Sequence, residues 1–522
     1  MIQKIKKWFS TENLIIAAVI FVAIFFTKFP TLYHWLNTPK GYWYPKNTSW
    51  FDAWDINVYV SYIRYGQKAG VFLENTYTTV PHPKEFIYQY YTFLGVFNRF
   101  LHLDPFVLFH LASIATSIVL ILVTYYVIKI FIEDNTLRIA AFIISILGGG
   151  FGWISYLQGA DIWNAGFTTV NAFERGHDAL GTVFLLLSMV NIYLFTATRS
   201  TKYLLYGIFS SLGSIAINPT FIILYLPVSL AATFSAENNK QRMKSLIYPI
   251  SLAVMFSIYY LLFLAHLSTN PGFANIGQTN LGIINSFSLI SGFGFLSIFL
   301  MWTLMSNYKN NNKIIFVNFF FLSQLFFVYF PVDFNLYFIK GLYLWGVILA
   351  SYGLNTLITN KKILNVTSTV LVLTAILTRV YIFNSLMNAE TQNPFFYLTK
   401  PEGEAISYMA KLPSDKAVLS LYRVGNYIPA HTDNIVYYGH KHQTPNGETT
   451  LRMSQLFYTS LNEEQQRKFL SDNHIDYIYY GIEEAQLRKN NKLEISTPFP
   501  YFPIVFSNDS VIVFGTGKSE IK

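Results

Sequence analysis

The chain has 522 residues, of which 52% are hydrophobic and only 12% are charged, and it contains no cysteine. A soluble domain usually carries about 25% charged residues, so this composition excludes an ordinary soluble enzyme and indicates a multi-pass membrane protein. The lack of cysteine excludes disulfides, a thiolate nucleophile and cysteine-ligated metal sites. The net charge of +9 requires no nucleic acid partner, because many of the basic residues lie in short loops assigned to the cytoplasmic face.

Apolar stretches of membrane-spanning length recur between Leu14 and Phe383. A helix needs about 20 mainly apolar residues to cross the hydrocarbon core, and this length predicts about eleven spans here. The predicted spans cover residues 13–30, 105–131, 139–158, 179–197, 203–217, 219–234, 246–266, 283–304, 314–331, 336–357 and 364–383. The predicted fold class is an all-α polytopic membrane bundle of about 11 transmembrane helices, followed by a C-terminal extracytoplasmic α/β domain.

Lysine and arginine lie in alternate loops between these spans. The basic loops precede the first span and follow the second, fourth, sixth, eighth and tenth, with Lys4, Lys6, Lys7, Arg138, Arg199, Lys202, Lys240, Arg242, Lys244, Lys309, Lys313, Lys361 and Lys362. Of the opposite loops, 267–282 and 332–335 contain no Lys or Arg, and 159–178 contains only Arg175. Because cytoplasmic loops are enriched in these residues, we expect the N-terminus inside and everything after Phe383 outside.

This topology predicts two domains in a cell-membrane protein. Residues 1–383 form the transmembrane domain, which begins with a retained signal anchor because no small-residue cleavage site follows the first apolar run. Its external loop, 31–104, carries two helices, at 55–70 and 85–101, that we expect to lie in the membrane interface. Residues 384–522 form the extracytoplasmic α/β domain.

The tail alternates predicted helices with predicted strands, which is typical of a partly parallel sheet. Helices are expected at 402–412 and, in two parts divided near Ser460, at 449–473, and strands at 417–421, 434–438, 475–480 and in a final hairpin around 505 and 511–514.

Two carboxylates, Asp52 and Asp55, follow the first span on the predicted external side. One interpretation makes them helix N-caps, and Asp55 stands directly before the predicted amphipathic helix. The other makes one of them a general base, which takes a proton from an acceptor hydroxyl at the membrane surface. The two roles are compatible if the cap also orients the base.

Short motifs in the external loop and the tail carry a family resemblance. The loop contains Asp55-Ile56-Asn57-Val58-Tyr59, Ser61-Tyr62-Ile63-Arg64, Gly70 and Asn75-Thr76-Tyr77-Thr78, and the tail contains Tyr438-Gly439-His440-Lys441-His442-Gln443-Thr444-Pro445 and Ile475-Asp476-Tyr477-Ile478-Tyr479-Tyr480-Gly481. With these motifs the chain resembles bacterial membrane glycosyltransferases of the GT-C superfamily, which are relatives of the protein mannosyltransferases and the aminoarabinose transferases.

The resemblance implies an inverting glycosyltransferase. Its donor would be a sugar linked to polyprenyl phosphate in the membrane lipid, and its acceptor a glycan, lipid or protein on the external face. In the superfamily an Asp of the first external loop is the catalytic base. By position Asp55 is the match, with Asp52 in reserve.

The second external loop contains Glu174, Arg175, His177 and Asp178 at the mouth of a span, where ionisable groups are costly unless they are used. They could form a polar cap. Alternatively, Arg175 and His177 bind phosphate, with Glu174 as a second acid or metal ligand. His177 matches the histidine of a Pro-His pair that is common in the bacterial membrane glycosyltransferases that this chain resembles, with Gly176 in place of the proline.

The related proteins often carry an Arg pair after a Pro-x-x-Phe pattern. Here Pro331-Val332-Asp333-Phe334 is followed by Asn335, Leu336 and Tyr337, so the pair is missing. One interpretation is that Lys340, one turn deeper, replaces the Arg pair at the phosphate. The other is that Lys340 extends its ammonium group to the membrane surface or pairs with Asp333.

In the tail, His440 and His442, with His431, either shape a loop or contact substrate or a metal. No cofactor is certain, and a divalent metal ion is a candidate. The rival functions are a transporter or flippase of lipid-linked saccharide and a non-catalytic GT-C-like scaffold. A transporter should show intramembrane charges and repeated halves, and this chain has few such charges and no visible repeat. Because the Arg pair is missing, a non-catalytic scaffold remains an alternative function.

Overall fold

The computed structural model describes residues 10–154, 157–218, 221, 224–236, 239–274, 283–306, 311–330, 335–391, 393, 395–494 and 498–517. The chain divides into two compact units. The first comprises Met1–Pro30, His110–Leu261 and Asn280–Met387, and the second comprises Thr31–Phe109, Leu262–Thr279 and Asn388–Lys522. The contacts thus group the predicted external loop with the tail, which the sequence did not predict.

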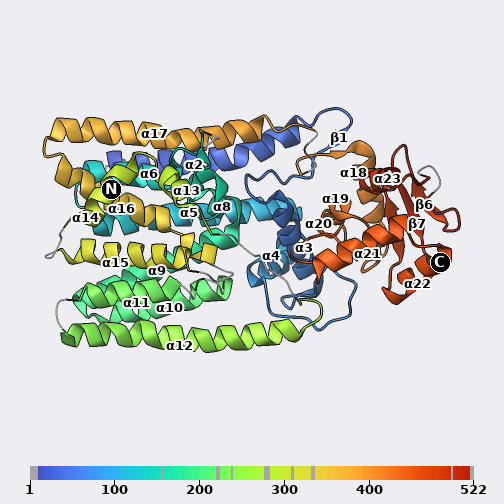
Figure 1. Ribbon diagram of the computed structural model, residues 1–522, viewed down its shortest axis with the longest axis horizontal. Coiled ribbons are helices and arrows are strands. Elements are labelled where there is room, and N and C mark those ends of the chain that lie inside the picture. The colour runs from blue at the N-terminus through green and yellow to red at the C-terminus, as the bar shows by residue number, and fades with distance from the viewer. Residues whose placement is uncertain are drawn as a thin grey trace. The chain divides into compact units, whose positions relative to one another are not determined.

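The first unit is a helical bundle, and most of its helices run side by side (Figure 1). Three of its helices, α2 (Thr11–Leu36), α5 (Pro105–Phe131) and α12 (Asn239–Thr269), extend at one end into the second unit. Its other helices are α6 (Asn135–Leu147), α7 (Ala160–Trp163), α8 (Val170–Glu174), α9 (Gly176–Thr198), α10 (Thr201–Ile217), α11 (Tyr225–Phe234), α13 (Ser286–Phe293), α14 (Leu296–Met305), α15 (Asn312–Val328), η3 (Asn335–Ile339), α16 (Leu342–Leu357) and α17 (Lys361–Met387). Buried aromatic side chains fill its core: the Trp345 ring packs at 5.7 Å from Phe131 and 5.1 Å from Phe320.

Six of the described helices are long and apolar enough to cross a membrane. The number rises to seven if α13 and α14, which meet at a bend of 108°, form one broken span. Each predicted span overlaps at least one helix or helix pair of the bundle. The count of eleven and the orientation stay predictions.

The third predicted span, 139–158, ends early, because α6 stops at Leu147 before a glycine-rich segment. The backbone N–H of Gly150 donates to Asp161 Oδ2 at 2.8 Å, and the Thr378 hydroxyl donates to the same oxygen at 2.7 Å. A side-chain carbon at Gly150 would lie 2.0 Å from the carbonyl oxygen of Ser291. The glycines let the backbone approach both the buried Asp161 carboxyl group and helix α13 closely, and α6 ends just before them.

The second unit contains a five-stranded sheet in the order β4-β3-β5-β7-β6 and a two-stranded β1-β2 ribbon. Its elements are β1 (Tyr42–Trp43), α3 (Ala53–Ala69), α4 (Gln89–Leu101), β2 (Leu398–Thr399), α18 (Lys400–Met409), β3 (Ala417–Leu419), α19 (Tyr422–Gly425), α20 (Ile428–His431), β4 (Ile435–Val436), α21 (Gly447–Thr459), α22 (Glu463–Asp472), β5 (Tyr477–Tyr480), α23 (Ile482–Asn490), β6 (Ile504–Ser507) and β7 (Ile512–Gly515).

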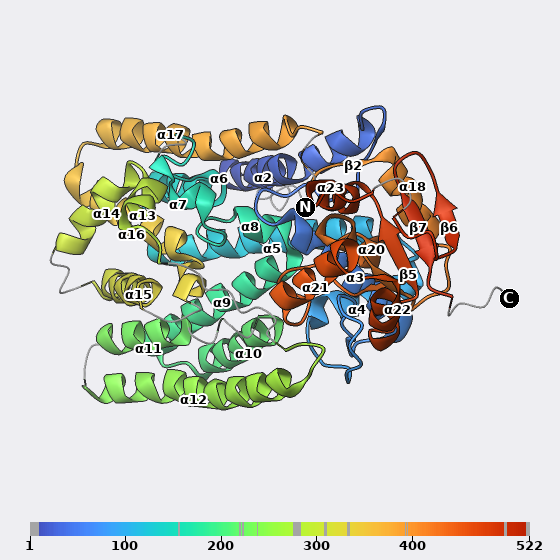
Figure 2. The same ribbon diagram turned by 45° about the vertical axis from the view of Figure 1, so that its right-hand side comes forward.

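The sheet is partly parallel, as the sequence predicted. Strand β3 pairs in parallel with β4 and with β5, while β7 pairs antiparallel with β5 and β6. Figure 2 shows β5, β7 and β6 with α22 and α23 nearby. The final hairpin and the two helices divided near Ser460 also form as predicted.

Helix α3 is a core helix of the second unit. Polar residues such as Asn57 and Ser61 are buried in it along with apolar ones. A side-chain carbon at Gly95 of α4 would lie 2.1 Å from the carbonyl oxygen of Ile63, so the two helices approach closely only because this position is glycine. The interfacial location predicted for these helices stays a prediction.

Candidate active site

Asp55 lies in the first turn of α3, and Asp52 is the N-cap residue. The interpretation of Asp55 as the N-cap is therefore wrong. Its backbone N–H already donates to the Asp52 carbonyl at 3.0 Å, because the helical turn begins before it. The Asp52 side chain makes no capping hydrogen bond. The Asp55 carboxylate is thus not part of the cap, and it projects from the beginning of a buried helix.

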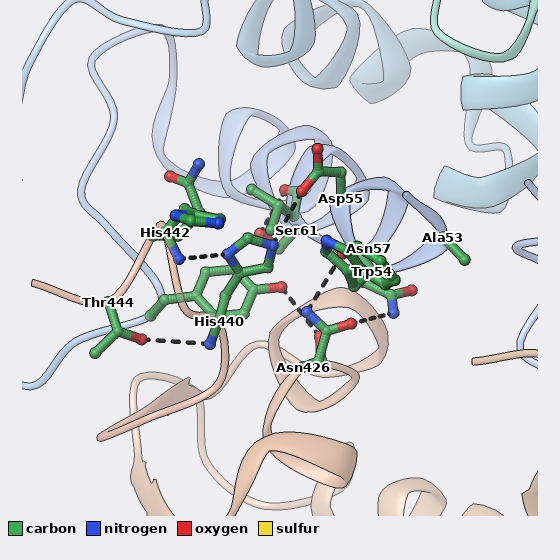
Figure 3. A network of polar contacts seen from close by, with 12 residues as sticks. Ala53, Trp54, Asp55, Asn57, Ser61, Asn426, His440, His442 and Thr444 are labelled. Carbon is green, nitrogen blue, oxygen red and sulfur yellow. Dashed lines mark hydrogen bonds and ion pairs between the residues drawn. The ribbon is translucent and has the colours of Figure 1, made fainter. Parts of the chain in front are cut away.

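The Asp55 carboxylate contacts His440 of the tail. His440 Nε2 lies 3.0 Å from Asp55 Oδ1, and Figure 3 shows the two side chains pointing toward each other. The backbone N–H of His442 donates to His440 Nδ1 at 3.1 Å. Because Nδ1 accepts, the ring proton of the neutral tautomer is on Nε2, and His440 donates to Asp55. The imidazole is 1% exposed and the carboxylate 24%.

The backbone around His440 is fixed by close packing. A side-chain carbon at Gly439 would lie 2.4 Å from the carbonyl oxygen of Gly425, so this approach requires glycine. The backbone N–H groups of Gly439 and His440 both donate to Thr444 Oγ1, at 3.4 and 3.3 Å. These contacts fix the backbone from which the His440 imidazole projects.

The loop and tail motifs that carry the family resemblance contact each other. The Tyr62 hydroxyl donates to Gln443 Oε1 at 3.0 Å, and the Asn75 amide donates to the Gln443 carbonyl at 2.8 Å. Outside the tail motifs, the Asn57 amide donates to Asn426 Oδ1 at 2.6 Å. Asn57 and Asn75 are buried, so these bonds replace water. Asn426 was not a candidate in the sequence, because no motif marks it.

Tyrosines surround the Asp55 carboxylate. Burial raises the pKa of Tyr422, and the charge of Asp55 raises it further. Burial also raises the pKa of Tyr77 well above its usual value, with a smaller contribution from Asp55. Both phenols therefore stay protonated at neutral pH, which leaves Asp55 as the acceptor of protons in this group.

The other two candidate histidines differ in their surroundings. His442 follows His440 in the same loop, with ring centroids 6.1 Å apart, and burial lowers its pKa. His431 packs against Phe106 and Trp43, with ring centroids 4.6 and 4.8 Å away. Within the described ranges no group of three or more His, Asp or Glu could hold a metal ion. The divalent metal stays a prediction.

His431 makes the second unit sensitive to acid. Burial, together with the nearby charge of Arg64, lowers its pKa to about 3. As pH falls below about 6.5 the unfolded chain gains a proton on this residue that the folded chain does not bind, so stability falls with pH. At pH 5 we expect this residue to cost about 2 kcal/mol relative to pH 7.

The measurement is the unfolding midpoint of purified protein at pH 7 and pH 5. In His431→Leu we expect a smaller drop between the two pH values than in wild type. His474→Asn, which changes an exposed histidine, should keep the wild-type drop. An equal drop in His431→Leu and wild type would show that His431 is not the acid-sensitive group.

A second polar cluster lies inside the first unit. Lys340 Nζ is 2.5 Å from Asp178 Oδ1, and the Asn171 amide donates to Asp178 Oδ2 at 2.8 Å. His177 Nε2 lies 3.9 Å from the same carboxylate. Asp178, Lys340 and Asn171 help to line a cavity of about 50 Å³. Sequence reasoning missed this partner of Lys340, and the alternative partner Asp333 lies outside the described residues.

Glu174 and Arg175 are buried where α8 ends and α9 begins. The Lys28 ammonium group donates to the Ser113 hydroxyl at 2.8 Å and reaches the Glu174 carbonyl at 3.5 Å. The predicted phosphate-binding residues of the second external loop and Lys340 therefore belong to the first unit, and the Asp55–His440 pair belongs to the second.

Solved structures share this fold over nearly the whole chain. The oligosaccharyltransferase of Archaeoglobus fulgidus, crystallised with a tethered acceptor peptide, matches 98% of this chain and 75% of its own, with 10% identity and a TM-score of 0.54. ArnT of Cupriavidus metallidurans bound to undecaprenyl phosphate matches 97% of this chain and 98% of its own, with 12% identity and a TM-score of 0.54.

The arabinofuranosyltransferase AftD from Mycobacteria matches 97% of this chain but only 40% of its own, with 11% identity and a TM-score of 0.57. These neighbours are GT-C glycosyltransferases. The chain therefore has the GT-C fold of multi-pass membrane proteins, which confirms the fold that the sequence resemblance implied. No protein-family model and no curated protein sequence matches the chain.

Proposed function

We propose that this protein is a GT-C glycosyltransferase that moves a sugar from a polyprenyl-phosphate carrier to an acceptor on the external face of the membrane. The observation that carries the proposal is the contact between Asp55 and His440 in a chain with this fold. It joins the loop position expected for the catalytic base to the tail motif of the same resemblance. The neighbours bind polyprenyl phosphate in one case and an acceptor peptide in another, which supports a lipid-linked donor and an external acceptor.

Asp55 is the proposed general base. It takes the proton of the acceptor hydroxyl while the hydroxyl oxygen attacks the anomeric carbon and the bond to the carrier phosphate breaks. The attack from the opposite side inverts the anomeric configuration. His440 holds the carboxylate by donating a hydrogen bond from Nε2.

The leaving polyprenyl phosphate carries negative charge that basic groups must neutralise. Arg175 and His177 are the proposed groups, with Glu174 as a neighbouring acid. Lys340 is already paired with Asp178, so its contribution requires an exchange of partners when the phosphate binds. His442 and the soluble tail are proposed to contact the acceptor. The test is whether purified protein in lipid releases polyprenyl phosphate from a polyprenyl-phosphate sugar in the presence of an acceptor.

The proposed orientation has eleven spans, a cytoplasmic N-terminus and an external tail. It rests on the alternation of Lys and Arg between loops. A reporter enzyme that works only outside the cytoplasm should be active when fused after residue 384 and inactive when fused at 310 or 360. Activity at 310 would reverse the orientation and move Asp55 to the cytoplasmic side. A cytoplasm-active reporter at the same three sites should give the opposite pattern.

A further inference from the structure

The second unit contains a cleft of about 550 Å³ that is lined in part by residues contacting His440 and helix α3. This volume lies within the range of about 300–1,000 Å³ that is typical of small-molecule sites. We propose that the cleft is an acceptor subsite and that it binds a neutral saccharide. The proposal rests on the proposed glycosyltransferase function and narrows its acceptor to a carbohydrate.

The cleft adjoins the candidate base through shared residues. Tyr422 and Asn426 line it. The Asn426 amide donates to the carbonyl of Trp54, the residue before Asp55, at 3.3 Å, and it accepts from Asn57 of the same helix. The Tyr422 ring lies 6.4 Å from the His440 ring. Two residues that line the cleft therefore contact the helix that carries Asp55 and the imidazole that binds it.

The lining combines aromatic rings with amide and carboxyl side chains. Phe395 and Tyr422 present aromatic rings, and Gln455, Gln486 and Glu483 present planar polar groups. A sugar ring has apolar C–H faces and a rim of hydroxyls that both donate and accept hydrogen bonds. Aromatic faces complement the first, and amides and carboxylates complement the second. Gln455 and Gln486 are exposed to solvent, so a ligand can reach them.

The charges of the cleft disfavour an anionic ligand. Arg423 is the only Lys or Arg among the described lining residues. Its Nε and Nη2 bind both carboxylate oxygens of Glu402, at 2.8 and 2.9 Å, and Glu402 is fully buried. Glu483 adds a carboxyl group to the lining. A phosphorylated or uronic acid acceptor would therefore meet an acid and a cation that is already neutralised.

The test is binding of saccharides to the full-length protein in lipid nanodiscs without donor, followed by saturation-transfer NMR. The probes are neutral trisaccharides of glucose, galactose, mannose and N-acetylglucosamine, with trigalacturonic acid as the acidic counterpart. At least one neutral trisaccharide should bind, and more tightly than the acid. Gln486→Ala and Gln455→Ala should each weaken it about 3–10-fold, because each loses one hydrogen bond.

Lys489→Ala, on the same helix as Gln486 but outside the cleft lining, is the matched control and should bind like wild type. The inference is overturned if no neutral trisaccharide binds, if trigalacturonic acid binds more tightly, or if the two glutamine variants bind like wild type. Saccharide binding without any sugar transfer would keep the subsite and reject the proposed function. Sugar transfer that is unchanged in both glutamine variants would keep the function and reject the subsite.

Discussion

Replacing Asp55 with asparagine is expected to lower the rate of sugar transfer by about 10²–10⁴-fold, the usual contribution of a general base. Asparagine keeps the shape of the side chain. Its Oδ1 can still accept the hydrogen bond from His440 Nε2, so the contact between loop and tail should survive. Only the basicity is lost. The measurement is the initial rate of transfer by purified protein, with the yield and unfolding midpoint of each variant measured in parallel.

Asp52→Asn is the matched control, because Asp52 is the N-cap of the same helix and makes no capping bond through its side chain. Asparagine also occupies N-caps about as well as aspartate. We expect a milder loss of transfer than in Asp55→Asn. Wild-type transfer by Asp55→Asn together with an inactive Glu174→Gln would place the base in the second external loop instead.

Lys340→Met is expected to destabilise the protein by about 3–5 kcal/mol, because it removes the cation nearest to the buried Asp178 carboxylate. The two side chains are only 12% and 7% exposed, and their charged atoms lie 2.5 Å apart. Asp178→Asn should also destabilise the protein, because it leaves the Lys340 ammonium group buried without its anion. The Asn171 amide, which donates to the Asp178 carboxylate, does not replace that negative charge. The measurement is the unfolding free energy, or the unfolding midpoint, of purified protein in one detergent.

The double variant Lys340→Met/Asp178→Asn distinguishes a coupled pair from two independent losses. Removing both charges leaves neither member of the pair without its partner. The double variant should therefore lose much less unfolding free energy than the sum of the two single losses. Additive effects of the single substitutions would show that the pair is not coupled. If the single variants are too unstable to purify, recovery of the double variant gives the same information.

The sequence predicted the bundle and the tail because their signals are local. Apolar length marks the helices, and the turn near Ser460 and the final hairpin mark the elements of the tail. The sequence analysis placed the end of the third span too late, because apolar content continues beyond Leu147 and outweighed the local signal of Gly148, Gly149 and Gly150. The partner of the Gly150 N–H, the Asp161 carboxylate, lies eleven positions away and is not marked by any local pattern.

The candidate site was predicted residue by residue but not as an arrangement. Asp55 and His440 were named from separate motifs, and they lie 385 positions apart. Lys340 and Asp178 lie 162 positions apart, and no local pattern links them. Such pairs depend on how distant segments pack, which periodicity and composition do not encode. The hydrogen bond that sets the tautomer of His440 likewise comes from a backbone group, which the sequence does not mark.

The central claim is transfer from a polyprenyl-phosphate carrier, and the most direct measurement follows a labelled sugar on that carrier. Purified full-length protein in lipid nanodiscs is incubated with the labelled donor and a panel of saccharide, lipid and peptide acceptors. We predict that label moves to an acceptor as an equal amount of polyprenyl phosphate is released. We also predict that the same sugar linked to a nucleoside diphosphate is not transferred. Consumption of the nucleotide sugar, or no consumption of the polyprenyl-phosphate sugar with any acceptor, would contradict the claim.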